Sequence, residues 1–178
     1  VKDVIQTLPY ELTQDQKQAV NDIFRDFKQD HISYRLIQGD VGSGKTIVCL
    51  LAAYAIITAK EQVSFMAPTE LLAQQHYQFF STYLKDIKIA LLTGKTKDKE
   101  AMKKAILNHE YDLVIGTHAL IEEDVMIHHL GLVIIDEQHK FGVKTRDELI
   151  QKAHAKDVIY LTATPIPRTL AMAAFGES

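Results

Sequence analysis

The chain contains six short apolar runs, and each is predicted to form a β-strand. Most of them are continuous rather than alternating, which is typical of parallel strands whose two faces are both buried. The runs lie at residues 34–38, 63–67, 88–93, 113–117, 132–136 and 158–163. They indicate one buried sheet.

Between the runs, apolar residues recur at spacings of three and four, which is the period of a helix that buries one face. The first such pattern starts at Thr13, and the others lie at residues 45–58, 70–84, 98–108 and 145–152. Strands that alternate with helices predict an α/β fold, a parallel β-sheet flanked by helices on both faces. No repeat or linker interrupts the pattern, so residues 1–178 are predicted to form one domain.

Glycine, proline and polar residues gather directly after the predicted strands. In an open parallel sheet, ligands bind beyond the carboxyl ends of the strands. The residues at these ends are Gly39, Pro68, Gly116, Thr117, Asp136, Glu137 and the segment 162–165. One edge of the sheet is therefore predicted to carry the functional site.

Composition and charge limit which partners and which cellular compartment the sequence predicts. Its 178 residues are 47% hydrophobic, which is enough for a substantial core. A net charge of −3 lacks the basic excess of many nucleic-acid binders, so any DNA contact has to be local. The one cysteine, Cys49, falls inside a predicted helix, where we expect a buried side chain in a reducing compartment. No apolar run reaches the roughly 18 residues of a membrane span, so we expect a cytoplasmic protein without a membrane partner.

The sequence GDVGSGKT at residues 39–46 connects the first predicted strand to the helix that follows. This pattern is typical of a phosphate-binding loop, in which backbone N–H groups and a helix N-terminus surround an anion; an ordinary flexible turn is the alternative. Lys45 is placed to reach the outer phosphates of a nucleotide, and the hydroxyl of Thr46 to bind Mg²⁺. The predicted phosphate-binding residues are Gly39, Gly42, Ser43, Gly44, Lys45 and Thr46.

Two carboxylates, Asp136 and Glu137, follow the aliphatic residues 132–135. A parallel strand that ends in adjacent carboxylates fits the second half of a nucleotide-hydrolysis site, because one acid can hold Mg²⁺ and the other can deprotonate the attacking water. We predict the first role for Asp136 and the second for Glu137, with Lys45 as the third catalytic residue. Alone, such a pair would be interpreted as surface acids, and it is the phosphate-binding loop that favours catalysis.

The sequence DEQH at residues 136–139, together with GDVGSGKT, resembles the helicase and translocase ATPases of superfamily two, which include the DEAD and DEAH box proteins. The resemblance implies a RecA-like lobe that binds ATP and Mg²⁺. It also implies that Gln16, which follows Leu12 and Thr13, contacts adenine through its side-chain amide. The rival interpretation is a helix capping box formed by Thr13 and Gln16.

Further motifs of that superfamily are matched at other predicted strand ends. The resemblance implies DNA-backbone contacts by Pro68, Thr69, Thr93, Gly94, Thr117 and His118. It implies coupling between ATP and DNA by His139, Thr162 and Thr164. Thr69 fits an ordinary helix N-cap equally well.

Lysines and acids alternate between the third and fourth predicted strands. Lys95, Lys97, Lys99, Lys103 and Lys104 are predicted to form a solvated helix face, the alternative being a nonspecific phosphate-binding patch. His128 and His129 lack a partner at metal-ligand spacing, so we do not predict a zinc site there.

Four longer phrases, QGDVGSGKT, MAPTELLAQQH, DEQHKFGV and TATPIPRTLA, resemble the first motor lobe of the bacterial branched-DNA helicases. The resemblance covers nearly the whole chain. It implies ATP-driven translocation on double-stranded DNA that remodels branched structures such as forks and Holliday junctions. The transcription-repair coupling translocases share some of these phrases and are the second choice.

Such motors close ATP between two RecA-like lobes. The resemblance therefore implies a parent chain that also supplies a second RecA-like lobe, with an arginine finger, and a wedge domain that recognises the branch. The chain stops at Ser178 just after a helical pattern begins, so we expect it to be one lobe of a longer polypeptide. An arginine finger accelerates hydrolysis by roughly 10³–10⁵, and Arg168 is not a candidate for it, so the isolated lobe should be nearly inactive. A nucleotide-binding module without turnover is the alternative, and the placement of DEQH and TATP disfavours a kinase or GTPase.

Overall fold

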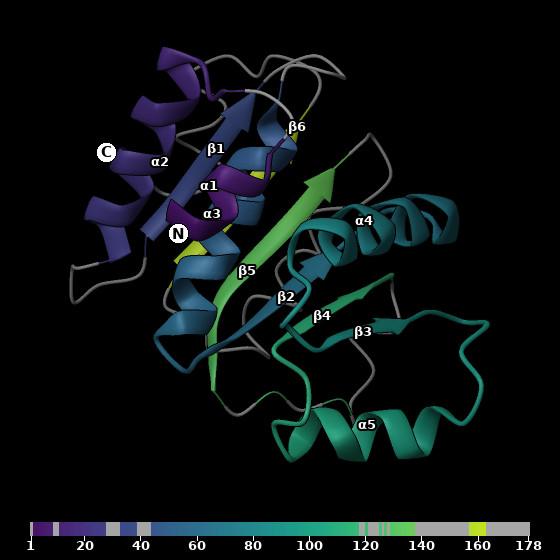
Figure 1. Ribbon diagram of the computed structural model, residues 1–178. Helices are drawn as coiled ribbons and strands as arrows, with labels where there is room; N and C mark the ends of the chain where they lie inside the picture. Colours follow the sequence, from purple (N-terminus) through teal and green to yellow (C-terminus); the bar gives the residue numbers. More distant parts are fainter. Residues whose placement is uncertain are drawn as a thin grey trace.

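A six-stranded, wholly parallel sheet forms the centre of the protein (Figure 1). The computed structural model describes residues 2–8, 11–27, 33–38, 44–117, 120, 125, 127, 129–137 and 157–162. The strands are β1 (Ser33–Gln38), β2 (Gln62–Met66), β3 (Ile89–Leu92), β4 (Leu113–Gly116), β5 (Leu130–Glu137) and β6 (Asp157–Thr162), in the order β1-β6-β5-β2-β4-β3. The predicted parallel sheet and its six strands are confirmed.

Five helices surround this sheet within the described residues. They are α1 (Lys2–Thr7), α2 (Gln14–Phe27), α3 (Lys45–Thr58), α4 (Glu70–Tyr83) and α5 (Lys99–Leu107). Four of them agree with the predicted helical patterns, whereas α1 was not predicted because six residues are too few to show a helical period. The helix predicted at residues 145–152 lies outside the described residues.

The side chains of the central strands point alternately into two hydrophobic clusters. Leu132 and Ile134 of β5 belong to a cluster that also contains residues of α1, α2, α3 and α4. Val133 and Ile135 belong to a second cluster, which includes Ile106 of α5. Helices therefore cover both faces of the sheet, as predicted, and Figure 1 shows α5 apart from the other four.

Helix α3 is apolar almost all round because it lies between the sheet and the helices α1 and α2 (Figure 1). Its residues from Ile47 to Ala53 are all buried. Cys49 is among them and is fully buried, which confirms the prediction for this residue. None of the described helices is long and apolar enough to span a bilayer.

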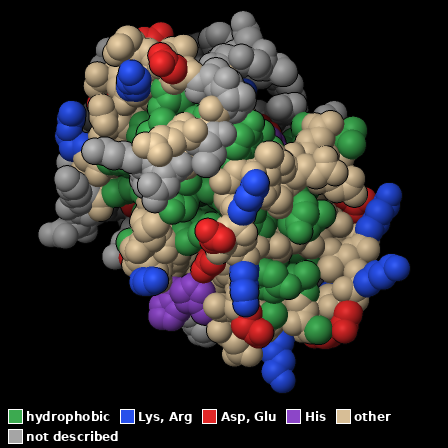
Figure 2. All heavy atoms as spheres, in the orientation of Figure 1, with side chains coloured by type: hydrophobic (Ala, Val, Ile, Leu, Met, Phe, Trp, Pro, Cys, Tyr) green, Lys and Arg blue, Asp and Glu red, His purple; other side chains and the backbone are tan. Residues whose placement is uncertain are grey.

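The lysines that follow β3 and continue along α5 do not all lie on a solvated face. Lys97 and Lys104 are exposed, but Lys103 is only 8% exposed and its ammonium lies 3.6 Å from Glu100 Oε1. The prediction was therefore wrong for Lys103, because the aliphatic part of a lysine can cover apolar surface while its ammonium reaches an acid. On the face shown in Figure 2, Lys and Arg side chains are dispersed among Asp and Glu.

Gln62, the first residue of β2, connects three segments that are far apart in the sequence. Its fully buried amide donates from Nε2 to the carbonyl oxygens of Tyr111 at 2.9 Å and Ile106 at 3.3 Å. Its Oε1 accepts from the backbone N–H of His129 at 3.4 Å. A buried polar side chain with three such contacts holds the end of α5 and the starts of β2 and β5 in register.

Replacement of Gln62 should therefore destabilise the fold. We expect Gln62→Leu to lower the free energy of unfolding by about 2–4 kcal/mol, because it leaves buried backbone groups without their partners. The measurement is urea unfolding, with Gln78→Leu on the exposed side of α4 as the matched control. Equal losses for the two variants would contradict the role given to Gln62.

Candidate nucleotide and nucleic-acid site

The N-terminus of α3 lies at the edge of the sheet where the strands end. Gly44 is its N-cap residue, with φ of 85°, and Lys45 and Thr46 open the first helical turn as half-buried residues. Unpaired N–H groups and the helix dipole make such a terminus suited to an anion. The predicted phosphate-binding residues Gly39, Gly42 and Ser43 lie outside the described residues.

Gln16 of α2 reaches this helix terminus through its side-chain amide. Its Oε1 accepts from the N–H of Thr13 at 2.9 Å, and its own N–H donates to Thr13 Oγ1 at 3.1 Å, so the capping box is confirmed. Its Nε2 donates to the carbonyl oxygen of Gly44 at 3.3 Å. The adenine contact stays a prediction, and the amide is 8% exposed with both of its polar atoms already engaged.

The register of three neighbouring strands brings the other predicted catalytic segments beside the end of β1, which precedes the predicted loop in the sequence. Thr162, the last residue of β6, pairs with Gln38 of β1 on one side and with Glu137 of β5 on the other. Neighbouring strands lie about 4.8 Å apart, so Glu137 lies two strand spacings from the residue that precedes Gly39. The segment predicted to couple ATP and DNA thus begins between the two halves of the predicted nucleotide site.

Asp136, near the end of β5, is 1% exposed and has an incomplete set of partners. Its Oδ2 lies 2.9 Å from Nε2 of His76 on α4. Within the described residues, its Oδ1 is buried without any hydrogen-bond partner. Buried carboxylate oxygens are seldom left unpartnered, and one or two carboxylates with several waters are the usual protein ligands of Mg²⁺. The Asp136 carboxylate is therefore of the chemical type that the predicted metal needs.

The pKa of the Cys49 thiol shows the influence of the charged groups near this site. Burial raises the pKa of its thiol far above the usual range, the nearby carboxylate of Asp136 raises it further, and the ammonium of Lys45 lowers it. The buried side chain on α3 is thus within electrostatic reach of both predicted catalytic groups. The thiol itself stays protonated and unreactive at neutral pH.

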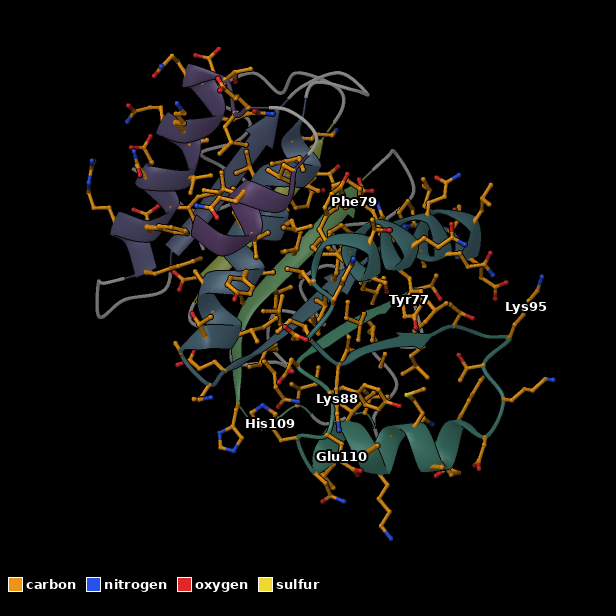
Figure 3. The ribbon with its side chains drawn as sticks, in the orientation of Figure 1. Tyr77, Phe79, Lys88, Lys95, His109 and Glu110 are labelled. Carbon is orange, nitrogen blue, oxygen red and sulfur yellow. The ribbon has the colours of Figure 1, made fainter. Side chains whose placement is uncertain are left out.

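Two of the predicted DNA-contacting residues are exposed and close to each other. Thr69 is the N-cap of α4, and its hydroxyl accepts from the N–H of Leu72 at 3.2 Å, which confirms the capping interpretation. Gly94 is exposed, and a Cβ placed on it would lie 3.2 Å from Glu70 Oε1. Glu70 also pairs with Lys95 at 3.5 Å, and Figure 3 shows Lys95 extending from the end of β3.

The other predicted DNA-contacting residues are less accessible. Pro68, Thr93 and Thr117 are buried, and the hydroxyl of Thr93 accepts from the N–H of Lys95 at 3.2 Å. They lie at the ends of β2, β3 and β4, which are adjacent strands. The remaining predicted site residues His118, His139 and Thr164 lie outside the described residues, as do the side chains of Glu137 and Thr162.

His76 is a site residue that sequence reasoning did not single out. It belongs to the phrase MAPTELLAQQH, seven residues after Thr69 and so on the same side of the helix. That spacing was the available signal, but only the folded structure brings the imidazole to Asp136, which is 60 residues away in the sequence.

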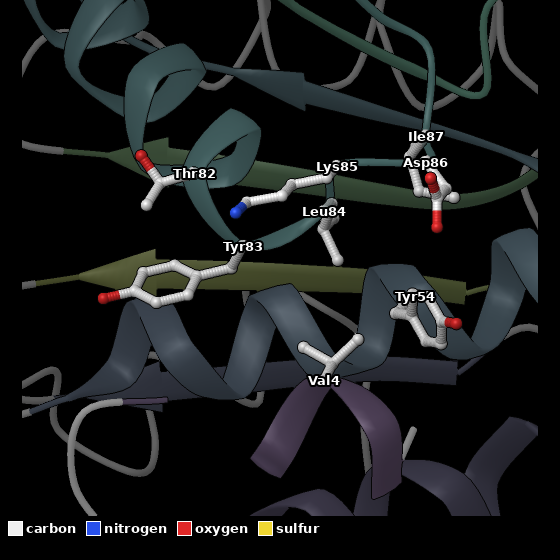
Figure 4. Close-up of a pocket in the computed structure, with 8 residues that line it drawn as sticks. All are labelled: Val4, Tyr54, Thr82, Tyr83, Leu84, Lys85, Asp86 and Ile87. Carbon is white, nitrogen blue, oxygen red and sulfur yellow. The ribbon is translucent and has the colours of Figure 1, made fainter. Parts of the chain in front are cut away.

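A separate pocket of about 430 Å³ opens among α1, α3 and the end of α4 (Figure 4). Val4, Tyr54 and Tyr83 contribute to its lining. Tyr54 lies nine residues along α3 from Lys45, a rise of about 14 Å. This pocket therefore belongs to a different part of the molecule from the predicted nucleotide site.

The parallel sheet with helices on both faces is an α/β fold, and residues 13–173 match the DEAD/DEAH box helicase family. The chain belongs to this family. Its sequence is 50% identical to the ATP-dependent DNA helicase RecG of Staphylococcus aureus (strain MRSA252) over 99% of the chain and 26% of that protein. RecG of Streptococcus pneumoniae is also 50% identical, over 96% of the chain and 26% of the relative.

Solved structures of helicases also match this chain. A structure of RecG bound to a three-way DNA junction matches with a TM-score of 0.85 and 44% identity, over 99% of this chain and 24% of that one. The UvsW helicase of bacteriophage T4, at 16% identity, matches with a TM-score of 0.68 over 92% of this chain and 58% of that one, which shows the fold alone. The chain spans about a quarter of the length of its curated relatives.

The contact between Gln16 and Gly44 can be tested by a double-mutant cycle. A Cβ on Gly44 would overlap Gln16 Nε2, and the positive φ disfavours any L residue. We expect Gly44→Ala to lower the free energy of unfolding by about 2 kcal/mol. In the double variant with Gln16→Ala, urea unfolding should show a smaller loss than the sum of the single losses; strict additivity would contradict this contact.

The raised pKa of Cys49 predicts a pH dependence of stability. The unfolded chain releases the thiol proton above pH about 8.5, whereas the folded protein retains it. The resulting stabilisation is full below that pH and is lost as the pH rises, by up to about 1.4 kcal/mol per pH unit. The measurement is urea unfolding of wild type and Cys49→Ala between about pH 7 and 10. The difference in the free energy of unfolding between the two proteins should shrink as the pH rises. A constant difference would contradict the buried, protonated thiol.

Proposed function

We propose that this chain is the ATP-binding motor lobe of an ATP-dependent DNA helicase that remodels branched DNA. The observation that carries the proposal is that the N-terminus of α3 and the buried carboxylate of Asp136, whose Oδ1 has no hydrogen-bond partner among the described residues, lie at the same edge of the sheet. The 50% identity to RecG over nearly the whole chain supports the helicase assignment, and the solved junction complex of RecG supports the choice of branched DNA.

The nucleotide would be held by the loop and the start of α3. In the proposed site, residues 39–44 offer backbone N–H groups to the phosphates, Lys45 offers its ammonium, and Thr46 offers its hydroxyl to Mg²⁺. Gln16 holds the carbonyl of Gly44 and is proposed to contact adenine. The capping box and the adenine contact can coexist if the second N–H of its amide serves the base.

The carboxylates at the end of β5 would arrange the chemistry. Asp136 is proposed to hold Mg²⁺, which when bound supplies charge neutralisation at the phosphates. Glu137 is proposed to orient the attacking water and to take its proton. Thr162, paired in register between Gln38 and Glu137, is the proposed start of the segment that relays the state of the nucleotide.

The DNA would bind over the other half of the same edge. The exposed residues Thr69 and Gly94 lie at the ends of β2 and β3 and are proposed to contact backbone phosphates. Such contacts need only a few donors and suit a chain with a net charge of −3. A second RecA-like lobe with an arginine finger, and a wedge domain, are proposed to complete the motor, since the relatives are about four times as long.

The proposal is tested in the full-length protein with Glu137→Gln and Lys45→Ala. We expect Glu137→Gln to bind a fluorescent ATP analogue normally and to lose about 10²–10⁴ in phosphate release on a synthetic three-way junction. Lys45→Ala should instead weaken binding of the analogue. Normal DNA-stimulated phosphate release by Glu137→Gln would exclude Glu137 as the general base. A wild-type protein that binds ATP but releases no phosphate would be a nucleotide-binding module without turnover.

A further inference from the structure

His76 contacts the proposed metal-binding residue from outside the motifs assigned to ATP. Its Nε2 lies 2.9 Å from Asp136 Oδ2, and both side chains are largely buried, at 13% and 2% exposure. An imidazole N–H at Nε2 can donate to a carboxylate oxygen at this distance. We propose that His76 is a positioning residue that fixes the Asp136 carboxylate for Mg²⁺. This inference rests on the proposed function.

The imidazole is itself held in place by the core. Its ring packs on that of Phe65, with centroids 4.5 Å apart, and Phe65 is fully buried in β2. Phe80, one helical turn further along α4, packs edge-on against the ring of Phe65, with ring centroids 5.5 Å apart. Aromatic packing on this side leaves the imidazole directed at Asp136, which lies on the neighbouring strand β5.

The contact leaves one particular oxygen free. Because Oδ2 is occupied by the imidazole, Oδ1 is the buried oxygen without a partner among the described residues. A carboxylate whose rotation is restricted in this way presents a single oxygen to the metal or its water, and the residues that orient ligating groups typically contribute 10–100-fold to metal affinity.

Two substitutions at position 76 test whether a hydrogen-bond donor must reach Asp136 from this side chain. The amide nitrogen of glutamine is as many bonds from Cβ as Nε2 of histidine, whereas that of asparagine is one bond closer and cannot reach Asp136. In the full-length protein, we expect His76→Gln to preserve the Mg²⁺ concentration that gives half-maximal binding of fluorescent ADP. His76→Asn should raise that concentration about 10-fold.

The matched control is Gln75→Asn on the exposed neighbouring position of α4, which reports any loss of helix propensity. Melting temperatures of all variants without nucleotide and Mg²⁺ test the fold, and ADP binding in EDTA should be equal in all of them. An unchanged or lowered Mg²⁺ requirement in His76→Asn would overturn the role of His76. A wild type that binds no nucleotide would instead overturn the proposed function.

Discussion

The parallel pairing of all six strands is the constraint on which the site depends. It places every strand's carboxyl end at one edge, so that residues from distant parts of the sequence meet there. The central strands can be this apolar because helices cover both of their faces, and their backbone groups are satisfied within the sheet. Any polar residue that remains buried at that edge then has to be explained by what it binds.

Strand order divides this edge into two halves. The strands β1, β6 and β5 end at the predicted phosphate-binding loop, at Thr162 and at the two carboxylates, whereas β2, β4 and β3 end near the residues proposed to contact DNA. The halves meet where β5 pairs with β2. The hydrogen bond from His76 to Asp136 crosses this boundary, and it arises from α4, the helix whose first residue follows Thr69.

The strands could be predicted because continuous apolar runs between helical patterns are typical of buried parallel strands. The phosphate-binding loop stays a prediction, because residues 39–43 lie outside the described residues. The predictions failed where the answer depended on tertiary contacts. Lys103 is buried because of how α5 packs, which no local charge pattern reveals. His76 has an ordinary position in an amphipathic helix, and only the pairing of β2 with β5 gives it a partner 60 residues away.

The buried Asp136 carboxylate is costly for the protein as long as nothing is bound at the proposed site. A buried oxygen that lacks a partner costs about 1–3 kcal/mol, and a native core seldom retains one unless it has a use. The cost is recovered when a ligand that binds only the folded state supplies the missing contact, because such binding stabilises that state by mass action. His76 lowers this cost by contacting one oxygen of the carboxylate, and in the proposed site the other oxygen, which has no hydrogen-bond partner among the described residues, is the one left for Mg²⁺.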